Sequence, residues 1–376
     1  MKKLNLALLE KNINAAAEYD FANNKVFGSA YSVCQRGKTV FHKCYGNTGL
    51  CGTPVADNTL FRLASMTKPI TAIAVLILVE RGLLSLDDCT SKYFPKIKDI
   101  HITDSNRNYL GLPKNLPTIR NLLSHCGGIG SNYDKFSNMT DADRKTLDAS
   151  VDYMIRIGLD YEPTTKQQYS GTGAFDLIAK IVEMVSGTDY LSFLNKEIFE
   201  PCGMVDTTFT PSTEQLGRLI KMHIRKDDKN DEFEMFEGCV FEAFPSTHYL
   251  GGAGLVSTIS DYMKFAKMLL NRGKTDTKRI VSEESIALMS TPWVPKEVQN
   301  GNERWGLGVR VITEPEYLYL PIGAFGWSGA YGSHFWIDPE NDICAVFMKN
   351  SKTDGGAANE SARFFEKAVY TSFEGE

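Results

Sequence analysis

A serine and a lysine lie three residues apart where a polar segment leads into an apolar one. Ser65 and Lys68 precede residues 70–79, an almost wholly apolar run that predicts a buried helix. Residues three apart on a helix share a face, so the two side chains should meet. A serine becomes a strong nucleophile when a base takes its proton, and a lysine is that base when burial and the helix dipole lower its pKa. The pair therefore indicates acyl transfer through a serine.

Two further segments carry groups that such a reaction uses. Tyr169 lies in a polar loop before a predicted helix that begins at Gly173. A phenol beside a lysine ionises below its usual pKa of about 10 and can pass protons. Residues 326–330 open a predicted strand with small side chains, so a backbone N–H there can face a substrate. Each feature also has a simpler explanation, because a loop tyrosine can pack on the core and a Ser-x-x-Lys pair can belong to a capped core helix.

Composition limits the partners of the chain. Its 376 residues carry a net charge of −5 with a pI near 5.8, which argues against nucleic acid or an anionic membrane as a partner. The apolar stretch after Met1 is interrupted by Asn5, so we expect no secretory signal, and residues 70–79 are too short to span a bilayer. We therefore expect a cytoplasmic protein with no membrane partner; its oligomeric state stays open.

The cysteines and histidines indicate neither a cofactor nor a metal site. The eight cysteines form no Cys-x-x-Cys pair and no Cys/His cluster at metal-ligand spacing, and the six histidines show no His-Glu-x-x-His pattern. In a large chain without an export signal, free thiols are favoured over disulfides.

The remaining pattern predicts helices between two groups of strands. Residues 25–46 predict a hairpin, and residues 305–313, 325–338 and 342–349 predict strands near the C-terminus. Outside the Ser65 helix, helices are predicted over residues 4–19, 119–124, 149–157, 173–186, 190–198, 259–271 (capped by Ser260 and Asp261) and 356–373. This order predicts an α/β (α+β) fold, with an antiparallel sheet flanked by helices and an inserted, mainly helical lobe. The polar residues 212–250 are the expected variable insertion.

In their order and separation, these segments resemble the serine β-lactamase and penicillin-binding-protein superfamily, in particular its class C β-lactamase and family VIII carboxylesterase branch. The likeness covers nearly the whole chain and extends to residues 117–125 (PTIRNLLSH), 251–258 (GGAGLVST) and 336–339 (WIDP). The resemblance implies a β-lactamase/transpeptidase-like fold. Residues 1–84 and 255–376 would form the sheet lobe and residues 85–254 the helical lobe, with the active site between them.

The resemblance also assigns a role to each matching residue. Ser65 would be the nucleophile, Lys68 its activating base, and Tyr169 the acid/base that relays protons to the leaving group. The backbone N–H groups of Ser65 and Ala330 would form the oxyanion hole. Acylation of Ser65 would be followed by attack of water on the acyl-enzyme. The expected substrate-binding positions are Gly171, Trp327, Ser328 and Gly329.

Two departures from the family pattern bear on the substrate. The lactamases and penicillin-binding proteins usually carry Asn two residues after the tyrosine, where this chain has Gly171. They usually carry Lys or His at the head of the third motif, where this chain has Trp327, as in the esterase branch. Without these polar contacts, the resemblance favours a carboxylesterase acting on small neutral esters. A β-lactamase or D-alanyl peptidase acting on amides is the alternative at the same site.

The alternative from another class is a non-catalytic ligand-binding or sensor protein on this fold. Such a protein should have lost Ser65, Lys68 or Tyr169, and all three are present. His125 is expected to be a hydrogen-bonded structural histidine. Glu162 precedes the tyrosine but lacks the spacing of a deacylating glutamate, so it is expected to be a solvated loop residue, and the base for deacylation stays unidentified.

Overall fold

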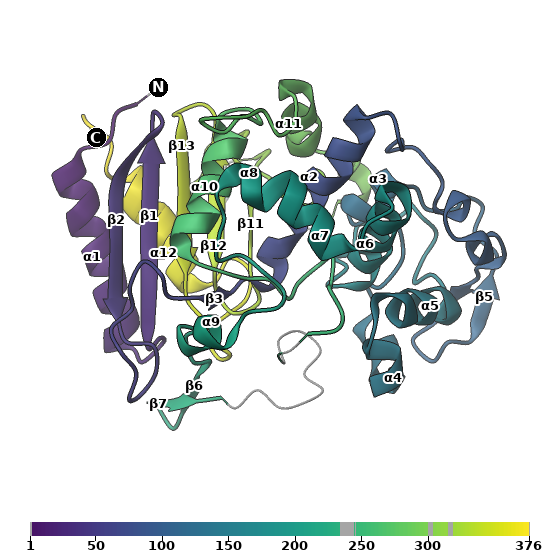
Figure 1. The fold of residues 1–376 in the computed structure, drawn as a ribbon, viewed down its shortest axis with the longest axis horizontal. Helices are drawn as coiled ribbons and strands as arrows, with labels where there is room; N and C mark the ends of the chain where they lie inside the picture. Colours follow the sequence, from purple (N-terminus) through teal and green to yellow (C-terminus); the bar gives the residue numbers. More distant parts are fainter. Residues whose placement is uncertain (1, 234–243, 245, 300–303, 315–318, 376) are drawn as a thin grey trace.

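The computed structural model describes residues 2–233, 244, 246–299, 304–314 and 319–375. A lobe that contains the main sheet lies beside a lobe of helices, and both termini lie at the outer edge of the sheet lobe (Figure 1). The two ends of the chain meet through a bridge between Leu4 and Phe373. Among the described residues, no helix has both the length and the apolar composition that a membrane crossing requires.

Seven antiparallel strands form the main sheet, and all of them come from the two ends of the chain. The predicted hairpin over residues 25–46 is confirmed as β1 and β2, and it pairs with the last strand, β13. The mixed fold with an antiparallel sheet flanked by helices is likewise confirmed. In spatial order the strands are β2 (Lys38–Gly46), β1 (Gly28–Gln35), β13 (Ile343–Met348), β12 (His334–Asp338), β11 (Phe325–Ser328), β10 (Arg310–Val311) and β9 (Arg304–Trp305).

Two stretches predicted as single strands are each broken in two by a glycine turn. Gly332 has a φ of 99° between β11 and β12, and Gly308 has a φ of 70° between β9 and β10. Glycine adopts these left-handed conformations at little cost, and they end a strand. The predictions of continuous strands over residues 305–313 and 325–338 are therefore wrong.

Helices cover both faces of the main sheet. On one face, α1 and α12 pack on each other and share an apolar core with the sheet, while α10 packs on β1, β12 and β13 from the opposite face. The cap of α10 is Thr258, whose side chain accepts from the Asp261 N–H, and not the predicted Ser260 and Asp261. The predicted C-terminal helix begins later than expected, because Gly356 and Ala358 have positive φ. The bounds are α1 Leu6–Ala22, α10 Ile259–Leu270, α11 Glu283–Ser290 and α12 Glu360–Tyr370.

The helical lobe is built around α6, which packs against α2, α3, α5 and α7. As predicted, α6 ends at Gly187, which has a φ of 72°. The predicted helix over 190–198 is divided, because α7 gives way to a π-helical turn, Asn195–Phe199, that continues into α8. The bounds are α2 Thr67–Glu80, α3 Ile119–Leu123, α4 Asp141–Arg144, α5 Leu147–Ile157, α6 Gly173–Ser186, α7 Tyr190–Leu194 and α8 Glu200–Cys202, with the small sheet β4 (Ile102–Thr103) and β5 (Tyr109–Gly111) beside them.

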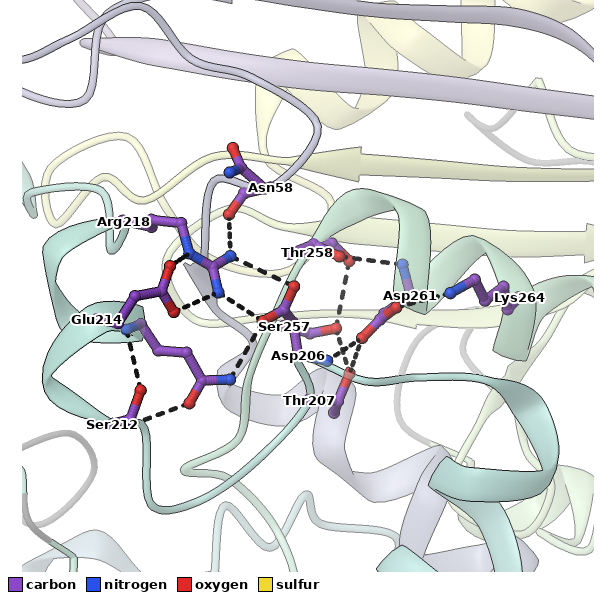
Figure 2. Close-up of polar contacts among 11 residues, drawn as sticks. Asn58, Asp206, Thr207, Ser212, Glu214, Arg218, Ser257, Thr258, Asp261 and Lys264 are labelled. Atoms are coloured by element: carbon purple, nitrogen blue, oxygen red, sulfur yellow. Dashed lines mark hydrogen bonds and ion pairs between the residues drawn. The ribbon is translucent and has the colours of Figure 1, made fainter.

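A network of charged side chains ties the end of the inserted segment to the sheet lobe (Figure 2). Arg218 donates to the carboxylates of Asp206 and Glu214 and to the Asn58 carbonyl, and the Asp206 N–H donates to Asp261. The proposed lobe of residues 85–254 therefore has its C-terminal part attached to the other lobe, and the predicted insertion 212–250 lies partly outside the described residues. The elements here are β3 (Phe61–Arg62), α9 (Thr213–Gly217), β6 (His223–Lys226), β7 (Lys229–Glu232) and β8 (Val256–Ser257).

Candidate active site

Ser65 and Lys68 lie where β3 turns into α2. Ser65 occupies a 3-10 helix, Ala64–Met66, and Lys68 lies in the first turn of α2. Ala64 has a φ of 45°, a left-handed conformation that costs a non-glycine residue about 1–3 kcal/mol. Lys68 Nζ is 3.2 Å from Ser65 Oγ. The structure thus brings together the two residues whose spacing first indicated a site.

The Lys68 amine makes two further contacts, both with carbonyl oxygens. Its Nζ donates to Gly171 O at 2.5 Å and to Gly252 O at 2.9 Å. A carbonyl oxygen can only accept, so a neutral amine gives its two N–H bonds to these groups and leaves its lone pair toward Ser65. Burial lowers the pKa of Lys68 to about 7, against the opposing charge of Asp176. The lysine can therefore take a proton from Ser65 near neutral pH.

The loop before β8 has to be glycine-rich to reach this amine. A Cβ built on Gly252 would lie 2.6 Å from Gly171 O and 3.2 Å from Lys68 Nζ. Any side chain there would push apart the two carbonyls that hold the amine. The neighbouring Gly251 carbonyl accepts a hydrogen bond from Thr71, one helical turn beyond Lys68 on α2. The GGAG segment therefore fixes the lysine through its backbone.

Tyr169 lies close to the amine and next to Trp327. Lys68 Nζ is 4.9 Å from the centre of the Tyr169 ring, and Trp327 Nε1 donates to the Tyr169 hydroxyl oxygen at 3.0 Å. A donor to that oxygen stabilises the ionised phenol more than the neutral one. The two positions that the sequence assigned to proton relay and substrate binding are thus in direct contact.

His125 packs against this group as a structural residue, as the sequence predicts. Its ring lies 4.5 Å from that of Tyr169 and 4.3 Å from that of Trp305, centre to centre. Its Nδ1 accepts the Ser170 N–H, which places the ring proton on Nε2. Burial, and then the nearby charge of Lys68, hold the pKa of His125 well below its usual value. The ring is neutral and positions the backbone next to Tyr169.

The end of β11 approaches the residues just before the nucleophile. A Cβ built on Gly329 would lie 2.4 Å from Leu63 O, so only glycine allows the two backbones to come this close. Ser65 and Ala330, whose N–H groups the sequence assigned to the oxyanion hole, therefore stand on adjacent segments.

Ser328 differs from the other predicted substrate-binding residues. Its neighbour Trp327 faces Tyr169, so the alternation of a strand turns Ser328 toward the opposite face of the sheet. The buried hydroxyl lies 2.8 Å from His334 Nδ1, and His334 Nε2 lies 2.9 Å from Glu366 on α12. The side chain is placed to anchor the strand, and the structure does not bring it to Ser65.

Sequence reasoning missed one aromatic residue beside the site, Tyr133. A Cβ on Gly171 would come within 2.5 Å of the Tyr133 hydroxyl oxygen. No pattern in the sequence links the two residues, because a separate segment, the 3-10 helix Tyr133–Asn138, brings the tyrosine to this position. Glu162, in contrast, accepts hydrogen bonds from the backbone N–H groups of Lys114 and Asn115, so its carboxylate holds a neighbouring loop in place.

Comparisons with known proteins identify the family of the chain. A family model described as Beta-lactamase matches residues 10–368. Esterase EstB of Burkholderia gladioli is 25% identical over 386 residues, which cover 94% of this chain and 93% of EstB. Penicillin-binding protein 4* of Bacillus subtilis (strain 168) is 30% identical over 344 residues, which cover 87% of this chain and 69% of that protein.

A solved structure supports the fold over the full length. EstCE1, described as a hydrolase with promiscuous acyltransferase activity, superposes with a TM-score of 0.83, covering 97% of this chain and 99% of its own. At 21% identity this likeness concerns the fold alone. The family match spans nearly the whole chain, so this protein belongs to the Beta-lactamase family, serine hydrolases of the β-lactamase fold whose relatives include esterases and penicillin-binding proteins.

Proposed function

We propose that the protein is a carboxylesterase that forms an acyl-enzyme on Ser65. The proposal rests on the burial and the contacts of the Lys68 amine. It is fully buried, its pKa is lowered to about 7, and two carbonyl oxygens take its N–H bonds while Ser65 Oγ lies 3.2 Å away. A surface lysine would stay protonated and could not act as a base at neutral pH.

The reaction begins when Ser65 Oγ attacks the ester carbonyl carbon and Lys68 takes the hydroxyl proton. The N–H groups of Ser65 and Ala330 stabilise the oxyanion, and one such donor typically contributes about 3–4 kcal/mol. Tyr169 passes a proton to the oxygen of the departing alcohol, and the Trp327 N–H stabilises the phenolate that remains. Water then attacks the acyl-enzyme and its proton restores the Tyr169 phenol, the acid leaves, and the protonated Lys68 returns a proton to Ser65 Oγ.

The residues around the amine favour a neutral substrate. Gly171 lacks a side-chain amide, and Trp327 supplies an aromatic wall in place of the cation that holds a carboxylate in lactamases. The ring of Tyr169 packs against Trp327, and the fully buried Trp305 supports both rings from behind. Apolar and aromatic linings bind acyl or alcohol groups of low polarity. We therefore assign small neutral esters as the substrate class, and EstB, named as an esterase, supports this choice.

A β-lactamase or D-alanyl peptidase activity is the second candidate. It is favoured by the 30% identity with Penicillin-binding protein 4*, which exceeds the identity with EstB. The two candidates share Ser65 and Lys68, so only the substrate separates them. Parallel assays with a chromogenic cephalosporin and a chromogenic butyrate ester rank them directly. A non-catalytic sensor would turn over neither compound.

The test is the initial rate on p-nitrophenyl butyrate for the native chain, Ser65→Ala and Ser192→Ala. Ser192 is an exposed serine on α7 and serves as the matched control. We expect clear turnover by the native chain and the control, and a loss of at least about 1,000-fold for Ser65→Ala. Equal rates for Ser65→Ala and the native chain would remove Ser65 as the nucleophile. Thermal unfolding of each variant shows whether a lost rate reflects lost fold.

A further inference from the structure

Three donor side chains converge on the outer strand of the main sheet, away from Ser65. His42 and Cys44 lie two apart on β2, so they project from the same face of the edge strand. Asp57, from the connection between β2 and β3, returns to this face. Each side chain offers one ligand atom, and the three atoms lie within 4.8 Å of one another.

Two of the three separations lie within about half an ångström of those in a metal's ligand shell. Asp57 Oδ1 lies 2.9 Å from His42 Nε2 and 3.7 Å from Cys44 Sγ. In tetrahedral zinc sites, bonds of about 2.0–2.1 Å to nitrogen or oxygen and about 2.3 Å to sulfur separate neighbouring ligand atoms by about 3.3–3.6 Å. Small rotations of the three side chains therefore bring all donors to bonding distance of one ion.

The orientation of His42 provides a second, independent observation. Its Nδ1 lies 3.2 Å from Ser32 Oγ, which is on β1 directly opposite His42 in the sheet register. A metal-bound histidine commonly donates its other ring N–H to an oxygen, which fixes the ring and the tautomer. In this structure Nε2 donates to Asp57 Oδ1 and Nδ1 can accept from the Ser32 hydroxyl; a metal ion that replaces the Nε2 proton would be matched by donation from Nδ1 to Ser32 Oγ, which can serve either way.

The charges at the cluster also favour a cation. Within the described part of the chain, the only ion-pair partner of Asp57 is His42, so no lysine or arginine pairs with this carboxylate. A surface ion pair between His42 and Asp57 would explain two of the donors. The Cys44 thiol donates to the same carboxylate oxygen at 3.7 Å, so a cation that replaces the thiol proton and the His42 ring proton would meet three ligand atoms already directed at one point.

We infer that His42, Cys44 and Asp57 form a zinc-type metal site, with water as the remaining ligand. A thiolate, an imidazole and a carboxylate suit a borderline-soft ion such as Zn²⁺ better than Mg²⁺ or Ca²⁺. The ion would clamp the edge strand to the connection that leads through β3 to Ser65. Its role would be structural, and the inference is independent of the proposed esterase activity. Sequence spacing alone predicted no metal site, because the fold brings in the third ligand.

Zinc titration of the EDTA-treated, tag-free chain by calorimetry tests this site. We expect one Zn²⁺ per chain, with at least about tenfold weaker binding for Cys44→Ser and Asp57→Asn. The Ser32→Ala variant lacks the hydroxyl oxygen that faces His42 Nδ1, and it should bind Zn²⁺ about 10- to 100-fold more weakly than the native chain. Cys51→Ser, which removes an exposed thiol outside the cluster, is the matched control and should bind like the native chain.

Cobalt provides a readout that does not depend on affinity alone. Co²⁺ bound to the native chain and to Cys51→Ser should give thiolate-to-metal charge-transfer absorption in the near ultraviolet, and Cys44→Ser should give none. Because the thiol must lose its proton, metal affinity should rise with pH. Absence of zinc binding, or binding and absorption that persist unchanged in Cys44→Ser, would overturn the inference. Thermal unfolding of the metal-free variants establishes that they are folded.

Discussion

The hydroxyl of Tyr133 fills the space that a side chain on residue 171 would need. The distance from that oxygen to a Cβ built on Gly171 is 2.5 Å. Gly171 is also one of the two residues whose carbonyls hold the Lys68 amine. The position at which this chain departs from the lactamase pattern therefore lies against the hydroxyl of an aromatic residue.

Gly171→Asn should lower kcat/KM for the butyrate ester by at least about tenfold. The new side chain competes with the exposed Tyr133 ring for the space beside the carbonyl that holds Lys68, and the part of the clash that the ring does not relieve falls on that carbonyl. Removing the obstacle in Gly171→Asn/Tyr133→Ala should recover part of the loss. Gly217→Asn is the control, since a Cβ there meets nothing within 4 Å. If Gly171→Asn is as active as the control, the packing does not constrain the site.

The ester hydrolysis rate should report the ionisation of Lys68. Burial lowers its pKa to about 7, and only the neutral amine can take the Ser65 proton. The value of kcat/KM should therefore fall about tenfold per pH unit below about pH 7 and level off above it. A profile of initial rates between about pH 5.5 and 8.5, corrected for uncatalysed hydrolysis, measures this. A flat profile would mean that Lys68 is not the titrating base.

Ser328→Ala should reduce stability while largely preserving catalysis. The mutation leaves His334 Nδ1 without its buried partner, a loss that typically costs about 1–3 kcal/mol. Because the hydroxyl faces α12, kcat and KM for the ester should each change less than about threefold. Urea unfolding and steady-state kinetics test the two parts separately. A large loss of kcat with unchanged stability would instead place the hydroxyl in the reaction.

His248 should stabilise the fold most at low pH. Its Nδ1 faces the Arg144 carbonyl and its Nε2 lies 3.0 Å from the buried Asp176 carboxylate, so both nitrogens need protons. Burial, the largest single influence, lowers the pKa of His248, but the charge of Asp176 and the hydrogen bonds to Asp176 and to the Arg144 carbonyl together outweigh it and raise the pKa above 6.5. A raised folded pKa gives stability that is complete below the unfolded pKa and is lost as pH rises through the folded value.

The thermal midpoint of His248→Gln compared with the native chain measures this effect. The thermal midpoint of the variant should fall furthest below that of the native chain under about pH 6, and the difference should shrink toward about pH 9. The exposed His101→Gln is the control and should show no comparable trend. A deficit that is constant with pH would exclude the ion pair with Asp176 as its cause.

Local patterns predicted the parts of the site that lie close in sequence. Ser65 and Lys68 share one helical turn, and the helix that follows Tyr169 was predicted to its final residue. The same reasoning failed for the two strands broken at Gly308 and Gly332, because hydrophobicity alone does not show where the backbone turns back.

Long-range contacts could not be predicted from spacing. The carbonyls that hold the Lys68 amine come from positions 103 and 184 residues further along the chain. Tyr133 reaches Gly171 only through the packing of a separate segment. Ser328 also lies in a motif that matches the family pattern. Its hydroxyl nevertheless points away from Ser65, because side chains alternate along a strand. It contacts His334, which in turn contacts Glu366 on α12.

The central claim is that Ser65 carries the acyl group, and mass spectrometry tests it most directly. The native chain is mixed with p-nitrophenyl butyrate, quenched in acid within the first turnover and digested. We predict a butyryl group on the peptide that contains Ser65, located to that residue by fragmentation, and no such group in Ser65→Ala. A butyryl group on a different residue of an active enzyme would contradict the mechanism.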